Sequence, residues 1–182
     1  MPGLARPVIP LTSGPVLQPV LQTAVQAIIV GSRNLRWPDE TACAAFAQQL
    51  ARHAPLLQAY VELHGPLGAG KTTFVRHLLR ALGVSGRIKS PTYTVMEPYA
   101  LPQMAISHFD FYRFSDPREW ADAGFRDVFA APGLKLAEWP EKAAGMLPVA
   151  DLRLFIEMDD ASPDARRVRL EAGTALGLAL LA

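Results

Sequence analysis

The chain has 182 residues, close to the ~150 that one domain usually takes. Hydrophobic residues make up 50% and charged residues 19%, which excludes wholesale disorder and is enough to build a core. The 18 lysines and arginines nearly balance the 17 acids, so the chain lacks the strong positive charge of a protein that coats nucleic acid on its own.

The single cysteine and the apolar stretches bear on the compartment. Cys43 cannot form a disulfide within the chain, which is typical of a reducing environment. Residues 1–20 hold several prolines and one charge, so they lack the charged start and unbroken apolar middle of a secretory signal. The apolar stretch 175–182 is far shorter than the ~20 residues of a membrane span. We expect a soluble chain without membrane contact, a flexible leader over residues 1–24 and one domain over residues 25–182.

The first predicted elements are a strand, a helix and a second strand. The β-branched run at residues 27–30 predicts the first strand. A proline and two acids precede an alanine-rich stretch, which predicts an amphipathic helix over residues 37–51. Pro55 ends this helix, and the apolar run over residues 56–63 predicts a buried strand that leads into a glycine-rich turn.

A second helix follows the glycine-rich turn and ends at Gly83. Its apolar residues recur at the three- and four-residue spacing of an amphipathic helix: Phe74, Val75, Leu78, Leu79 and Leu82. Downstream, strands are predicted over residues 92–96, 106–111, 134–137, 152–158 and 168–170, with short helical turns over 117–129. The last two strands and the polar turn at residues 159–164 predict an antiparallel hairpin. The pattern is that of an α/β fold.

The glycine-rich turn is a phosphate-binding loop. Residues 65–72, GPLGAGKT, match G-x-x-x-x-G-K-[ST] in full and lie between a predicted strand and a predicted helix, as the motif requires. The glycines let backbone N–H groups turn toward phosphate oxygens, and the helix directs its positive dipole end to the same anion. Lys71 would reach the β- and γ-phosphates, and Thr72 would offer a hydroxyl to Mg²⁺.

A magnesium site of this kind also needs an acid at the end of a neighbouring strand. Asp110 is the best placed, because it ends the apolar run 104–109. If this stretch is a strand, His108, Asp110 and Tyr112 share one face, with His108 read as a packed, hydrogen-bonded histidine. Glu138 is the second candidate, since it ends the strand-like run 134–137; otherwise it is a solvated acid with Trp139 covering the sheet edge.

No acid occurs between Leu63 and Met96, although this segment contains five basic residues: Lys71, Arg76, Arg80, Arg87 and Lys89. A solvated helix face beside a phosphate site is the interpretation that we favour, and an edge that binds nucleic acid or a partner stays open.

The nucleotide is more consistent with ATP than with GTP. The single asparagine, Asn34, precedes the loop, so a downstream N-K-x-D motif that reads guanine cannot exist. The loop alone does not say whether the phosphoryl acceptor is water or a metabolite, so a small-molecule kinase remains open. A scaffold that binds ATP without turning it over is a further alternative.

Four motifs together resemble the TsaE (YjeE-type) P-loop ATPases of tRNA threonylcarbamoyladenosine biosynthesis. They are GPLGAGKTT at residues 65–73, KSPTYT with EPY at 89–99, HFDFYR at 108–113 and EWP at 138–140, within a match over residues 41–169. The resemblance implies a P-loop fold with a mixed sheet and Mg²⁺-dependent ATP hydrolysis. It also implies work with the TsaB and TsaD proteins in the bacterial cytoplasm, where TsaD transfers the threonylcarbamoyl group to the adenosine next to the anticodon of tRNA.

The resemblance also implies roles for individual residues. Lys71, Asp110 and Glu138 would be catalytic, and Thr72, Asp110 and Glu138 would serve Mg²⁺. The loop at residues 90–92 would sense the γ-phosphate, and Thr41 and Arg167 would approach the adenine end. The residues implied to bind the nucleotide are Thr41, Gly68, Ala69, Gly70, Lys71, Thr72, Thr73, Thr92, Trp139 and Arg167. The family often has Asp where this chain has Pro66, a difference that leaves the glycine and lysine pattern intact.

Overall fold

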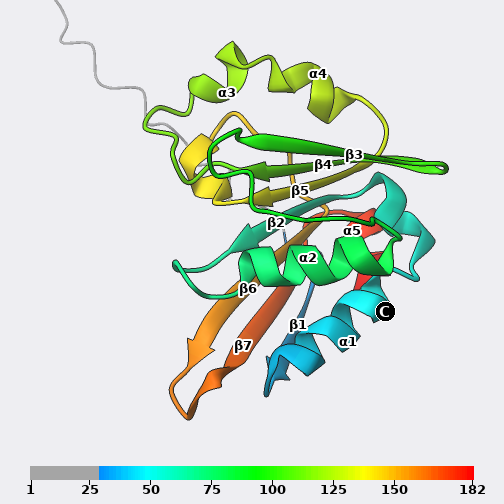
Figure 1. Ribbon diagram of the computed structural model, residues 1–182, viewed down its shortest axis with the longest axis vertical. Coiled ribbons are helices and arrows are strands. Elements are labelled where there is room, and N and C mark those ends of the chain that lie inside the picture. Colours follow the sequence, from blue (N-terminus) through cyan, green and yellow to red (C-terminus); the bar gives the residue numbers. More distant parts are fainter. Residues whose placement is uncertain (1–28) are drawn as a thin grey trace, which may run out of the picture.

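Strands and helices alternate along the chain and assemble into one seven-stranded mixed sheet with the order β1-β7-β6-β2-β5-β4-β3 (Figure 1). The computed structural model describes residues 29–182; the predicted leader and the first half of the strand predicted at 27–30 lie outside these residues. The strands are β1 (Gly31–Trp37), β2 (Tyr60–His64), β3 (Met96–Leu101), β4 (Met104–Asp110), β5 (Leu134–Glu138), β6 (Leu152–Asp159) and β7 (Ser162–Ala172).

The helices connect these strands. They are α1 (Glu40–Leu50), α2 (Lys71–Ala81), α3 (Glu119–Asp122), α4 (Phe125–Ala130) and α5 (Ala175–Leu180), with 3₁₀ turns η1 (Ala54–Gln58) and η2 (Pro140–Ala143). Within residues 29–182, none of them is long and apolar enough to cross a membrane.

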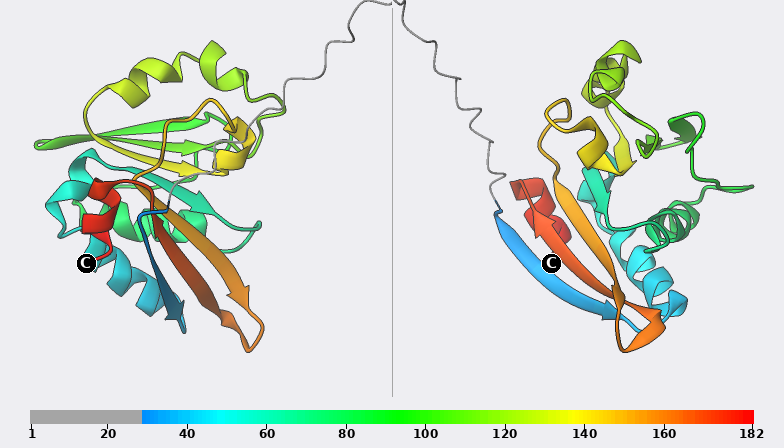
Figure 2. Two further views of the ribbon diagram at one scale, coloured as in Figure 1. Left: turned by 180° about the vertical axis from the view of Figure 1, so that it is seen from behind. Right: turned by 90° about the vertical axis from the view of Figure 1, so that its left-hand side faces the viewer.

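The centre of the sheet is parallel and its edges are antiparallel. β2 runs parallel to β5 and β6, and β4 runs parallel to β5. β3 pairs antiparallel with β4 at one edge, and β7 pairs antiparallel with β6 and β1 at the other. The predicted C-terminal hairpin is therefore confirmed, and it extends well past the end of β2 (Figure 2). The parallel strands bring their carboxyl ends, and the residues that follow them, to one edge.

Two hydrophobic clusters cover the sheet. Helices α1 and α2 lie side by side (Figure 1) and bury Leu50, Phe74 and Leu78 against Val61 and their strand neighbours. A second, aromatic cluster lies under α3 and α4. It contains Tyr60, Phe109, Phe111, Trp120 and Phe125. Because successive side chains of a strand point to opposite faces, Tyr60 of β2 joins the aromatic cluster and Val61 joins the first cluster.

Two predicted strands are misplaced: the described part of the one at 27–30 lies outside β1, and the one at 56–63 begins only at Tyr60. Ile29 and Val30 precede the first strand, which starts at Gly31, although the Val30 amide still bonds to the Ala172 carbonyl at 2.8 Å. β1 is an edge strand with most of its residues partly or fully exposed, so no apolar run marks it. In the segment 56–63, the first residues form η1, and Leu56 is apolar because it packs in the core rather than because it lies in a strand.

The strand predicted over residues 92–96 is wrong, because this segment turns and β3 starts at its end. Val95 has a left-handed backbone with φ of 64°, which breaks any extended run there. β3 itself contains Pro98, and its place at the edge of the sheet is where a strand tolerates a residue without an N–H donor. The predicted helices at 37–51 and after the glycine turn are confirmed as α1 and α2, and the turns at 117–129 as α3 and α4.

Candidate functional site

The glycine-rich loop joins the end of β2 to the start of α2 and has the backbone that its sequence demands. Gly65, Gly68 and Gly70 all have positive φ, and a Cβ at Gly65 would lie 2.1 Å from the Ile156 carbonyl oxygen. No side chain caps the N-terminus of α2. Its first backbone N–H groups are thus available to an anion held in the loop.

Lys71, the first residue of α2, is almost fully buried beside this loop. Its ammonium donates hydrogen bonds to the carbonyl oxygens of Gly65, at 2.6 Å, and Pro66, at 2.9 Å. It also lies 3.8 Å from the ring centroid of Trp139, a cation–π distance. Burial lowers the pKa of Lys71 below the ordinary lysine value, while the carboxylates of Glu138, Glu141 and Asp110 act in the opposite direction. The Lys71 ammonium is thus held beside the loop, largely shielded from water.

Glu138 faces this lysine from the end of β5. It is 2% exposed, so the alternative of a solvated acid is wrong. Its Oε2 accepts a hydrogen bond from the Thr72 hydroxyl at 2.9 Å, and its Oε1 lies 2.9 Å from Nε2 of His108. The next residue, Trp139, has a left-handed backbone with φ of 57°, a conformation that a non-glycine residue adopts only where its surroundings impose it.

Asp110 ends β4 directly beside Glu138, since the two residues are register partners. Its Oδ2 accepts hydrogen bonds from the hydroxyls of Ser90 and Thr92, the second at 2.7 Å, and its Oδ1 accepts one from the Tyr112 amide at 3.0 Å. Asp110 therefore ties the segment 90–92 to the strand end.

The sequence ranked Asp110 as the best-placed acid, and in the structure Glu138 lies nearer to the loop. β5 is the direct neighbour of β2, whereas β4 is one strand farther out, so Glu138 is the acid that contacts Thr72. The predicted shared face of His108, Asp110 and Tyr112 is wrong for its last member. β4 ends at Asp110, and Tyr112 is 43% exposed with its ring 5.0 Å from that of Trp139.

These side chains surround a cavity of about 280 Å³. Its lining includes most of the residues predicted to bind phosphate or metal: Gly68, Gly70, Lys71, Thr72, Thr73, Thr92, Asp110, Glu138 and Trp139. Within residues 29–182, no three His, Cys, Asp or Glu side chains are grouped so as to hold a metal ion by themselves. A hydroxyl and two carboxylates suit Mg²⁺ that arrives with a nucleotide, because Mg²⁺ takes one or two carboxylates together with substrate phosphates and water.

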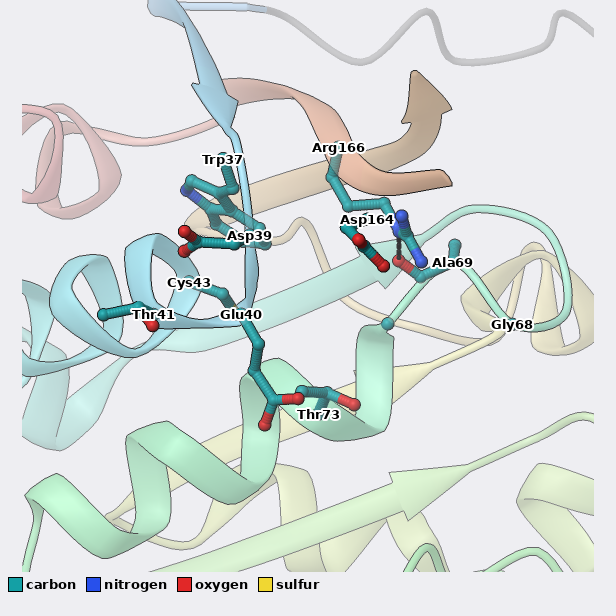
Figure 3. A pocket seen from close by; sticks show the side chains of 11 residues that line it. Trp37, Asp39, Glu40, Thr41, Cys43, Gly68, Ala69, Thr73, Asp164 and Arg166 are labelled. Carbon is teal, nitrogen blue, oxygen red and sulfur yellow. Dashed lines mark hydrogen bonds between the residues drawn. The ribbon is translucent and has the colours of Figure 1, made fainter. Parts of the chain in front are cut away.

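A larger cavity of about 430 Å³ opens on the other side of the loop (Figure 3). It shares Gly68, Gly70 and Thr73 with the smaller cavity, so the two spaces are adjoining compartments around one loop. The end of β1, the start of α1 and the first residues of β7 form its other walls: Trp37, Asp39, Glu40, Thr41, Cys43, Asp164 and Arg166. Burial, with a smaller contribution from Glu40, raises the pKa of the Cys43 thiol to about 12, so this cysteine is not a nucleophile at neutral pH.

Arg166, not Arg167, reaches this larger cavity. Its Nε donates to the Ala69 carbonyl oxygen at 2.8 Å, a bond drawn in Figure 3. Arg166 is the register partner of Trp37, and both line the cavity. Strand alternation turns Arg167 to the opposite face, where its guanidinium bonds to Asp160 at 3.1 Å. The sequence named an arginine around Arg167 for the adenine end, and Arg166 is the arginine of this run that lines the cavity, opposite Trp37.

Every other residue predicted for the site lines one of the two cavities. The sequence missed Trp37, Asp164 and Arg166, which belong to β1 and β7 and meet only when these strands pair. The sequence carried a partial signal: Val168 and Leu170 are buried and alternate with the exposed Arg167 and Arg169, which places Arg166 on the buried face but does not show that Trp37 lies opposite it. Arg76 and Arg80 of the basic segment line neither cavity.

Comparisons with known proteins agree on one family. The family model for threonylcarbamoyl adenosine biosynthesis protein TsaE matches residues 37–168. The tRNA threonylcarbamoyladenosine biosynthesis protein TsaE of Haemophilus influenzae is 42% identical over 146 residues, which cover 77% of this chain and 89% of that protein. The protein of the same name from Bacillus subtilis is 32% identical over 145 residues, covering 77% of this chain and 87% of that protein.

The fold has a counterpart among solved structures. The crystal structure of YdiB from Bacillus subtilis superposes with a TM-score of 0.68, at 24% identity, over 83% of this chain and 92% of that one. This similarity shows the shared α/β fold, which agrees with the P-loop fold predicted from the strand, glycine turn and helix.

Proposed function

The chain belongs to the threonylcarbamoyl adenosine biosynthesis protein TsaE family, and from this premise we propose that it is a magnesium-dependent ATPase. In this proposal it supports the TsaB and TsaD proteins in the threonylcarbamoyl modification of the adenosine next to the anticodon of tRNA. The proposal places the chain in the bacterial cytoplasm, and its contact with tRNA would be indirect, through the complex.

One observation carries the ATPase proposal: the Thr72 hydroxyl, at the start of an uncapped helix, donates to a buried carboxylate from the neighbouring strand. A loop that only closes a hairpin needs no buried acid at this point. In phosphoryl-transfer proteins of the P-loop type, a hydroxyl of the loop and a strand-end acid hold Mg²⁺ between them. Thr72 and Glu138 provide this pair.

The surrounding residues divide the remaining tasks. The N–H groups around Gly68 and Gly70 and the first turn of α2 would bind the phosphate oxygens. Lys71 would bring its charge to the β- and γ-phosphates, and Asp110 would lie beside Glu138 while it holds Thr92. When bound, Mg²⁺ would neutralise charge on the β- and γ-phosphates. The larger cavity, with Thr41 at its wall, would take the nucleoside.

The test is release of phosphate from ATP by the full chain, measured alone and with purified TsaB and TsaD. We expect slow release alone, faster release with both partners, and a loss of both in Lys71→Ala. Lys142→Ala is the matched control, because this lysine of η2 is exposed and lines neither cavity.

Two outcomes would contradict the proposal. If ATP binds but no phosphate is released in either condition, the chain is a nucleotide-dependent scaffold. If labelled γ-phosphate appears on a small hydroxyl compound, the chain is a metabolite kinase.

A further inference from the structure

His108 is the only polar residue among the inward-facing positions at the centre of β4. Its side chain is fully buried, and its neighbours on the same face, Ile106 on β4 and Leu136 on β5, are apolar and equally buried. A histidine placed there only to fill space could be replaced by such a residue. Its polar atoms therefore point to another role.

The hydrogen bond of His108 is directed at the candidate site. A carboxylate only accepts, so the 2.9 Å contact with Oε1 of Glu138 requires that Nε2 of His108 carry the proton. The second ring nitrogen, Nδ1, is buried and has no hydrogen-bond partner within residues 29–182. Within the described residues, the bond to Glu138 is thus the one hydrogen bond that the His108 side chain makes.

The arrangement leaves Glu138 held at both oxygens. Thr72 of α2 donates to Oε2 and His108 of β4 donates to Oε1, each at 2.9 Å. A glutamate side chain has three rotatable torsions, and without a second donor one oxygen would be free to turn away from Thr72. Groups that bind to the ligands of a metal in this way fix the orientation of those ligands.

We propose that His108 is a positioning residue, whose Nε2–H holds Glu138 in the orientation in which it meets Thr72 and the metal-bound nucleotide. The inference rests on the proposed function, because it assigns His108 to the same phosphate end. It acts through Glu138, and His108 itself does not touch the nucleotide.

The chain offers a matched histidine–glutamate pair away from the site. Nε2 of His64 lies 3.0 Å from Oε2 of Glu62 on β2, on the face of the sheet opposite to α2. His64 lines neither cavity and stacks on Phe155, with ring centroids 4.5 Å apart. Loss of this pair removes a partly buried histidine–glutamate contact of similar length that does not involve Glu138.

The experiment compares His108→Gln, His108→Asn and His64→Asn in the full chain. The amide nitrogen of glutamine reaches about as far as Nε2, whereas that of asparagine ends near the unused Nδ1. ADP binding is measured by calorimetry with EDTA and across a Mg²⁺ titration, and kcat and KM for ATP are measured with TsaB and TsaD.

We expect ADP affinity in EDTA to stay within about twofold of wild type in all three variants, since the loop amides and Lys71 are unchanged. His108→Asn should raise about tenfold the Mg²⁺ concentration that gives half of the maximal gain in ADP affinity. It should also lower kcat about tenfold, with little change in KM. His108→Gln should recover most of this loss, and His64→Asn should show none of it.

A double variant tests whether His108 acts through Glu138. In the Glu138→Gln background, His108→Asn should cause little further loss, because the group that it orients is already gone. Additive losses would overturn the inference, and so would wild-type behaviour of His108→Asn. A loss of ADP binding in EDTA that glutamine does not recover would also overturn it, since that result indicates a structural role. A wild-type chain that binds no nucleotide would instead refute the proposed function together with this inference.

Discussion

The two ends of the candidate nucleotide site are built differently. At the phosphate end, Lys71, Asp110 and Glu138 are all less than 5% exposed. Side-chain hydrogen bonds there link α2 to β5, β5 to β4, and β4 to the 90–92 segment. At the nucleoside end, the walls come from α1 and β7, and residues such as Thr41 and Asp164 are exposed. A preorganised end binds without further ordering, so the phosphates should provide most of the affinity.

Lys71→Ala should cause the largest loss in the molecule. The ammonium makes charge-assisted hydrogen bonds, worth ~1.5–3 kcal/mol each, so ATP affinity should fall by at least about tenfold to a hundredfold. The melting temperature should change little, because loss of the two bonds to the loop carbonyls is offset by removal of a charge whose burial is unfavourable. Calorimetry with ATP and a thermal melt would measure both. Wild-type affinity in this variant would show that the loop is not where the phosphates bind.

Glu138→Ala should cause the next largest defect, and its form separates two roles. If Glu138 binds Mg²⁺, Mg-ATP affinity should fall by about tenfold and recover partly in excess Mg²⁺. If Glu138 orients the attacking water, binding should be intact and turnover reduced. We expect the metal role, because Glu138 contacts the Thr72 hydroxyl directly and a base contributes little to a loose phosphoryl-transfer transition state.

A titration of Mg-ATP affinity with EDTA as the metal-free reference, alongside single-turnover hydrolysis, distinguishes the two roles. Glu157→Ala is the matched control, since this glutamate of β6 lies on the outer face near Arg167. If Glu138→Ala changes neither binding nor turnover, the buried acid is structural and the contrast between the two ends is lost.

The contrast also explains what could be predicted from the sequence. The phosphate end consists of short contiguous motifs at strand ends, so the loop, Asp110 and Glu138 were all identified. The nucleoside end depends on the pairing of Trp37 with Arg166, which lie far apart in the chain, and Arg167 was named instead. No local pattern encodes this pairing.

The same distinction holds for the fold. β5 and β6 lie inside the sheet and carry apolar runs, and both were predicted within a residue or two. β1 and β3 are edge strands with few buried residues, and β3 contains Pro98, so one was placed too early and the other was missed. Edge strands need only one neighbour and little burial, which leaves a weak signal in the sequence.

Arg166→Ala should have a smaller effect, since it tests how the nucleoside end supports the phosphate end. Its guanidinium joins the Ala69 carbonyl of the loop to the carbonyls of Pro163 and Ala165 at the tip of the hairpin. Loss of one such bond, at ~1 kcal/mol, should reduce ATP affinity by about fivefold. Arg167→Ala, on the opposite face, should reduce it by less than about twofold. Equal losses in the two variants would show that the arginines of β7 act on ATP affinity through their positive charge alone, and that the contact of Arg166 with the loop does not matter.

Thr41→Ala should have the smallest effect. Thr41 lines the larger cavity from the first turn of α1, but it is exposed, and its hydroxyl makes no hydrogen bond among the described residues. An exposed hydroxyl that exchanges a water for a ligand gains little, so we expect ATP affinity to fall by less than about threefold. Gln48→Ala, an exposed position farther along α1, is the control for changes to the helix alone. Affinities for ATP and GTP would be measured in parallel for both variants. A loss of affinity of about tenfold in Thr41→Ala for ATP but not for GTP would show that the nucleoside end recognises the base by direct contact. The larger cavity would then contribute to affinity as the phosphate end does.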